Sequence, residues 1–178
     1  MRIDRLRDEF DLQLRWSVFP LHPETPQEGR ELSELFAGRM DIESMLQRLY
    51  QVAGELELPI GQRSRTYNSR RAQELGKWAE EQGVGEAFHM AVYHAYFVDG
   101  RNIALTEELL SIATELGLDA EMARQVIDTR SHAATVDADW QRAAELGITA
   151  VPTSIFQERA LVGFQPYAYY RRLISTAD

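Results

Sequence analysis

Cysteine is absent from all 178 residues, which excludes disulfide bonds and any thiolate chemistry carried by this chain. The absence agrees with a reducing compartment. Long apolar runs are also missing, and none approaches the roughly 18 residues that a membrane-spanning helix requires. The N-terminal residues are charged throughout and lack the apolar stretch of a signal peptide. The sequence therefore predicts a cytoplasmic protein with no membrane contact.

Positive charge is scarce as well. The chain has 19 lysine and arginine residues against 28 aspartate and glutamate residues, a net charge of −9. A surface that binds the phosphates of nucleic acid needs clustered basic side chains, and those of this sequence are scattered. We therefore expect no nucleic-acid partner. With 44% hydrophobic and 26% charged residues, the composition is that of an ordinary globular protein.

Hydrophobic periodicity changes along the chain. Residues 3–10 repeat with helical spacing, and the run from Leu12 to Val18 then alternates with polar neighbours, which predicts a helix followed by a strand. A proline-rich loop follows at residues 19–26. Most of the remaining chain is helical in pattern, with Asp41, Asn68 and Asp119 placed to cap helices. The order indicates an α/β protein with a large helical insertion.

The segment 147–156 is the most informative one. Gly147 can end a helix because it tolerates a positive φ, and Pro152 opens a strand where its missing N–H costs least. The runs 153–157 and 160–162 then predict a hairpin with Glu158 and Arg159 as its turn. Pro166 is well placed to begin a terminal helix.

Five segments, in this order and spacing, resemble the FrnE-like branch of the DsbA superfamily, which is related to 2-hydroxychromene-2-carboxylate isomerases and kappa-class glutathione transferases. They are Phe19-Pro20-Leu21-His22-Pro23-Glu24-Thr25-Pro26, Ala95-Tyr96-Phe97-Val98-Asp99-Gly100-Arg101-Asn102-Ile103, Gly117-Leu118-Asp119, Leu146-Gly147-Ile148-Thr149-Ala150-Val151-Pro152-Thr153 and Val162-Gly163-Phe164-Gln165-Pro166. The resemblance covers essentially the whole chain.

The resemblance implies a predominantly helical, thioredoxin-like fold of the DsbA type. Residues 1–30 and 131–178 would form the thioredoxin-like part, and residues 31–130 the helical insertion. It also implies a cis bond between Val151 and Pro152, in a loop whose backbone contacts a peptide or a small thiol. The implied substrate-binding residues are Thr149, Ala150, Val151, Pro152 and, in the proline-rich loop, His22.

The sequence departs from the family pattern at its N-terminal end. Family members begin with a central strand that ends in Cys-x-x-Cys or a serine variant, and this sequence starts inside the helix that follows. It is either a natural short form or the product of an internal start. A sheet without its central strand leaves unpaired edges, so we expect a homodimer that covers them.

Three classes of function remain open. The first is a disulfide oxidoreductase, or a glutathione-dependent isomerase, whose active-site segment is missing from this sequence and which is therefore inactive in thiol exchange as it stands. The second is a redox-dead module that binds a peptide or a thiol. The third is a helical interaction protein whose main property is self-association. We expect no bound cofactor.

The spacing of the histidines does not predict a metal site or a hydrolytic site. Glu86 and His89 match one half of a di-iron motif, which needs a second such unit. His89 and His94 are five residues apart and diverge on a helix, so we expect no metal site. Hydrolysis by a serine such as Ser131 would need an adjacent base and an orienting group, and the spacing places no histidine beside one.

Overall fold

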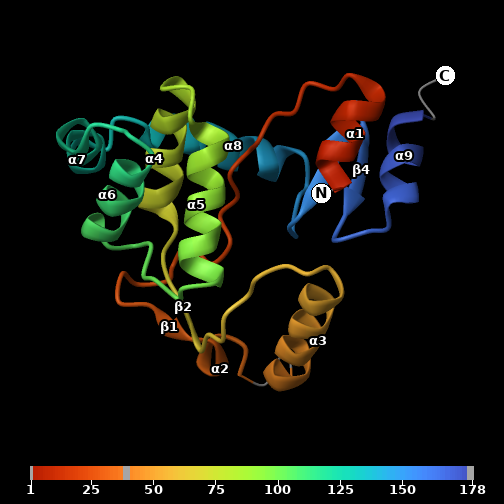
Figure 1. Cartoon of the computed structure of the whole chain (residues 1–178), viewed down its shortest axis with the longest axis horizontal. Coiled ribbons are helices and arrows are strands. Elements are labelled where there is room, and N and C mark those ends of the chain that lie inside the picture. Colours follow the sequence, from red (N-terminus) through yellow and green to blue (C-terminus); the bar gives the residue numbers. More distant parts are fainter. Residues whose placement is uncertain (1, 38–40, 176–178) are drawn as a thin grey trace. The chain divides into compact units, whose positions relative to one another are not determined.

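The computed structural model describes residues 2–37 and 41–175 (Figure 1). Two compact units make up the chain: a larger one from Pro20 to Asp137, and a smaller one that joins the residues up to Phe19 with those from Ala138 onward. The elements are α1 (Arg2–Phe10), β1 (Arg30–Glu31), α2 (Leu32–Leu35), α3 (Ile42–Glu55), β2 (Arg65–Thr66), α4 (Arg70–Glu81), α5 (Gly85–Phe97), α6 (Thr106–Glu115), α7 (Ala120–Thr129), α8 (Ala133–Glu145), β3 (Thr153–Phe156), β4 (Arg159–Val162) and α9 (Tyr167–Ser175).

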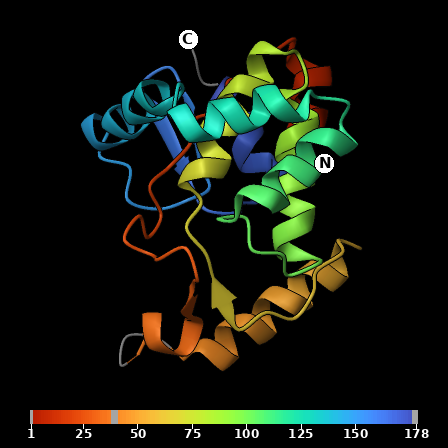
Figure 2. The same ribbon diagram turned by 90° about the vertical axis from the view of Figure 1, so that its left-hand side faces the viewer.

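The core of the larger unit is formed by α4, α5, α6 and α7, which lie together in both ribbon views (Figures 1 and 2). Leu75, Phe88, Leu109 and Ile112 are its largest fully buried apolar side chains. Each comes from an apolar stripe that repeats every three or four residues, so one face of its helix turns inward. This core confirms the helical character predicted for the middle of the chain.

Helix ends in the larger unit follow local chemistry. Asp41 and Asp119 accept hydrogen bonds from the backbone N–H groups of Ser44 and Met122, as expected of N-caps. Asn68, predicted to cap α4, lies one residue before the N-cap Ser69, and its side chain accepts from the N–H of Arg70 at 2.8 Å in a turn that leads into the helix. The caps at Asp41 and Asp119 confirm the predicted starts of α3 and α7.

Glycine ends two of the core helices. Leu118 N–H donates to Ala113 C=O at 3.0 Å and Gly117 N–H donates to Thr114 C=O at 2.9 Å, the paired bonds of a Schellman motif. The same pair of bonds follows α4 at Gly83 and α3 at Glu57. Glu57 adopts a φ of +54° there, a conformation that glycine tolerates far better.

A short antiparallel pairing in the larger unit was not predicted. Arg30 pairs with Thr66 and Glu31 with Arg65, so β1 and β2 tie the start of the helical region to the segment before α4. The Arg65 guanidinium reinforces the pairing through a 2.7 Å ion pair with Glu31. Gly29 precedes β1 with a φ of +84°, and a Cβ there would lie 2.5 Å from the Tyr67 ring.

The smaller unit is built around the β3–β4 hairpin. Phe156 pairs with Arg159, so the turn residues are Gln157 and Glu158, one position earlier than expected. Gln157 has a φ of +56°, as a two-residue hairpin turn requires. The sequence does not predict this turn, because the residue is neither glycine nor asparagine.

Two helices accompany the hairpin. α9 packs on β4, and α1 packs on α9. The Arg171 guanidinium bonds Glu9 at 2.8 Å and Arg5 stacks on the Tyr167 ring at 4.0 Å, so charged side chains join the two helices. The hydrogen bond from the Tyr167 hydroxyl to Glu9 adds a third link.

The strand predicted from Leu12 to Val18 does not form. These residues have no regular secondary structure, since no other strand pairs with them in the described part of the chain, and a strand exists only through a ladder with a neighbour. Side-chain bonds hold the segment instead. The buried Asp139 carboxylate accepts from the Val18 N–H at 3.1 Å and from Arg15 at 3.2 Å.

Across residues 2–37 and 41–175, every helix is too short or too polar to span a lipid bilayer.

Candidate functional site: a proline loop beside an open strand edge

The loop between α8 and β3 begins with a Schellman motif. Ile148 N–H donates to Ala143 C=O at 2.9 Å, and Gly147 N–H donates to Ala144 C=O at 3.0 Å. Gly147 has a φ of +65°, so it ends the helix in the way the sequence predicted. The turn fixes the direction in which the chain leaves α8 and enters the loop.

The four loop residues selected from the sequence, Thr149 to Pro152, are all exposed, and the Val151–Pro152 peptide bond is cis. The hydroxyl of Thr153 donates to the Ala150 C=O at 2.6 Å. The Pro152 C=O accepts from Gly163 N–H at 2.7 Å, which joins the loop to the hairpin. Val151 is different, because neither its N–H nor its C=O has a hydrogen-bond partner within residues 2–37 and 41–175.

The register of the hairpin leaves one edge of β3 open. Since Pro152 bonds Gly163, and backbone groups alternate in direction along an antiparallel strand, Ser154 and Phe156 also face β4. Thr153 and Ile155 therefore direct their N–H and C=O groups away from β4. No further strand pairs with β3 in the described part of the chain. The free groups of Val151, Thr153 and Ile155 together form what we call the open edge.

One face of the same hairpin is apolar and uncovered. Ile155 lies opposite Ala160, and Thr153 lies opposite Val162. Ile155 is 39% exposed and Val162 is 52% exposed, values that are high for branched apolar side chains. The opposite face, with Phe156 and Leu161, is half-buried. The open edge thus lies beside an apolar surface that a ligand can cover.

His22 lies in the larger unit, whereas the proline loop belongs to the smaller one. Its ring meets the Phe36 ring edge-on at a centroid distance of 5.7 Å, and Nδ1 lies 3.8 Å from a Glu24 carboxylate oxygen. Its backbone has a φ of +54°, and its C=O accepts from Thr25 N–H at 3.0 Å. These contacts account for a half-buried loop histidine and give it no catalytic partner among the described residues.

The histidines of α5 form no metal site. The His89 ring packs against the Tyr93 ring with 4.7 Å between the ring centroids. Burial lowers the pKa of His89 more than the nearby carboxylates of Glu80 and Glu86 raise it. His94 pairs with Asp99 at 3.3 Å on the surface. Across residues 2–37 and 41–175, no three histidine, aspartate or glutamate side chains gather as metal ligands.

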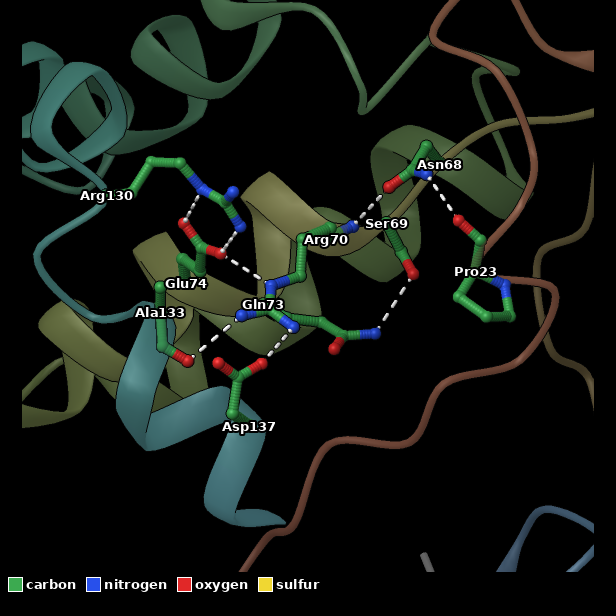
Figure 3. A network of polar contacts seen from close by, with 9 residues as sticks. All are labelled: Pro23, Asn68, Ser69, Arg70, Gln73, Glu74, Arg130, Ala133 and Asp137. Carbon is green, nitrogen blue, oxygen red and sulfur yellow. Dashed lines mark hydrogen bonds and ion pairs between the residues drawn. The ribbon is translucent and has the colours of Figure 1, made fainter. Parts of the chain in front are cut away.

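A buried carboxylate organises the polar centre of the larger unit (Figure 3). Glu74 is 1% exposed and accepts from Arg70 Nε at 2.5 Å and from Arg130 at 2.7 Å. Arg70 also bonds the Ala133 C=O at 3.0 Å and Asp137 at 2.7 Å. Burial raises the pKa of Glu74, but the hydrogen bonds from Arg130 and Arg70 outweigh it and hold that pKa below its ordinary value.

Figure 3 shows that this network joins α4 to the end of α7 and the start of α8. Both oxygens of the Glu74 carboxylate are engaged by arginine. A buried carboxylate held in this way by two arginines is directed at them rather than at a ligand. We therefore assign the network a structural role and place the candidate site at the open edge.

A helix-rich chain with a strand hairpin entered through a cis-proline loop fits the thioredoxin-like class. The sequence model of the DSBA-like thioredoxin domain family matches residues 1–175. The chain belongs to this family.

Known proteins agree with that assignment. The uncharacterized protein YwbO of Bacillus subtilis is 26% identical over 174 residues, which are 93% of this chain and 82% of that protein. A probable DsbA oxidoreductase from Streptomyces coelicolor superposes with a TM-score of 0.76 at 28% identity, over 84% of this chain and 68% of that one. A 2-hydroxychromene-2-carboxylate isomerase superposes with a TM-score of 0.69 at 19% identity, over 97% and 83% of the two chains, and shows the fold alone.

Proposed function

We propose that this polypeptide binds an extended peptide by strand addition along the open edge and carries out no thiol exchange. The supporting observation is the set of main-chain groups on Val151, Thr153 and Ile155 that have no partner in the part of the chain the structure describes. An added strand takes its affinity from such groups and its specificity from the side-chain surface beside them. The apolar face with Ile155 and Val162 favours a ligand with alternating apolar residues.

The absence of exchange rests on chemistry. Thiol–disulfide exchange passes through a mixed disulfide, which needs a thiolate on the protein. The sequence has no cysteine, and serine cannot replace one in this reaction. We place the binding function in the cytoplasm, because a chain without cysteine suits a reducing compartment.

The test uses two probes, a fluorescein-labelled peptide of alternating valine and threonine residues and reduced glutathione. Ile155→Pro removes an outward N–H without touching the ladder to β4, and Ile155→Thr is the matched control that keeps the N–H. We expect the peptide to raise the anisotropy with the native chain and Ile155→Thr, and much less with Ile155→Pro. Equal binding by all three would refute strand addition. Saturable binding of glutathione alone would favour a thiol site instead.

An insulin-reduction assay on the same samples tests the second half of the proposal. The expected rate is that of the buffer blank. A rate that follows the protein through purification would overturn it.

A further inference from the structure

A serine, a histidine and a glutamate form a hydrogen-bonded chain at the surface of the larger unit. The Ser131 hydroxyl lies 2.9 Å from Nδ1 of His132, and Nε2 of His132 lies 3.1 Å from a Glu81 carboxylate oxygen. The expectation that no histidine lies beside a serine hydroxyl is therefore wrong at this position. Glu81 ends α4, fifty positions before Ser131, so only the fold brings the third residue in.

The two hydrogen bonds select one tautomer of the neutral His132 ring. An ionised carboxylate only accepts, so Nε2 carries the proton and donates to Glu81. Nδ1 is then the unprotonated nitrogen and accepts from the Ser131 hydroxyl. This is the arrangement of a nucleophile, a general base and a residue that orients the base.

Ser131 and His132 differ in their exposure to solvent. The His132 side chain is 12% exposed, so the base is largely shielded from water. Ser131 is exposed, and a substrate can reach its hydroxyl. The next residues begin α8, a helix of 13 residues, in whose first turn the N–H groups of Ala134 and Thr135 have no acceptor in the described part of the chain. Such N–H groups stabilise negative charge that develops beside them.

We propose that Ser131 is a nucleophile toward small activated carboxylic esters, with His132 as its general base and Glu81 as a positioning residue. In the first step the Ser131 Oγ bonds the carbonyl carbon while its proton passes to Nδ1 of His132. The alcohol leaves with that proton, and acyl-Ser131 remains. Water then attacks the acyl group, gives its proton to His132 and releases the carboxylic acid, and the proton returns to Ser131.

The experiment incubates the full chain with p-nitrophenyl acetate, follows p-nitrophenol release and locates the acetyl group by peptide mass spectrometry. Background acylation is limited, because Lys77 is the sole lysine of the sequence and is buried. The expected result is acetyl-Ser131 in the native chain and none in Ser131→Ala. Ser111→Ala is the matched control, since Ser111 is exposed and donates to a carboxylate, Glu115, rather than to a histidine.

Two further variants separate chemistry from structure. His132→Ala should lower the acylation rate on the order of 100-fold, the usual contribution of a general base, and added imidazole should restore part of it. In Glu81→Gln, the ¹⁵N shifts of the His132 ring should move away from a pure Nε2–H tautomer while the melting temperature stays unchanged. Equal p-nitrophenol release by Ser131→Ala, or acetylation elsewhere only, would overturn the proposal.

Discussion

The substitution Glu74→Gln probes the buried network most directly. Glutamine keeps the shape of glutamate but removes its charge and turns one acceptor oxygen into an NH₂ donor, which then faces an arginine. The arginine partners differ in exposure, with Arg70 at 15% and Arg130 at 57%. Arg130 can turn into water after the change, whereas Arg70 stays largely buried.

The magnitude follows from these exposures. Breaking a buried ion pair by removing one partner costs about 3–5 kcal/mol when the other charge is left unpaired. Here Arg70 keeps the Ala133 C=O and Asp137 as acceptors, and Arg130 is rehydrated. We therefore expect a loss of about 2 kcal/mol in the free energy of unfolding, near the value of one hydrogen bond to a charged group.

The pH dependence of the free energy of unfolding tests the role of Glu74 more specifically than a measurement at a single pH. Because the folded-state pKa of Glu74 is lowered below 4.5, the carboxylate stabilises the fold above that pH, and this contribution is lost as the pH falls through the folded-state pKa. Urea titrations at pH 7 and at successively lower pH should show that the native chain and Glu74→Gln differ less and less in free energy of unfolding below about pH 4.5.

The matched control is Glu145→Gln, an exposed glutamate that accepts from Gln141 at 2.8 Å. It should change the free energy of unfolding by no more than about 0.5 kcal/mol. The assigned role of the buried carboxylate would be refuted if Glu74→Gln lost no more free energy of unfolding than the control. It would also be refuted if the loss stayed the same in acid.

Two other predictions concern a helix end and assembly. Glu57→Gly should raise the free energy of unfolding by about 0.5–1 kcal/mol in a urea titration, because glycine relieves the positive φ of this Schellman position; a loss of stability would contradict it. We also expect two copies to associate over the apolar hairpin face, so light scattering should give a dimer for the native chain and a monomer for Val162→Asp. A native chain that stays monomeric at high concentration would rule this association out.

Helices were predictable from the sequence because their signals are local. The spacing of apolar residues, the caps at Asp41 and Asp119, and the glycine that ends α8 all act within one or two turns. The DsbA-like fold followed from short segments in a fixed order. Each of these features depends on neighbours in the sequence, and the structure reproduces them.

Features that depend on distant partners were missed or misplaced. The alternation from Leu12 to Val18 has the pattern of a strand, but a strand needs a ladder, and Asp139 holds this segment instead. β1 and β2 span two residues each, too few to show any period. The glutamate beside His132 comes from α4, and no spacing rule relates the two.

The proposed binding and thiol exchange need different chemical groups. Holding an extended ligand needs main-chain N–H and C=O groups, which nearly every residue type supplies. Exchange needs one particular side chain, and the sequence does not contain it. The register with β4 alone directs the outward groups of Thr153 and Ile155, and no thiol takes part in it. The strand edge therefore needs no thiol, and Ile155→Pro tests the edge in a chain whose residues carry out no exchange reaction.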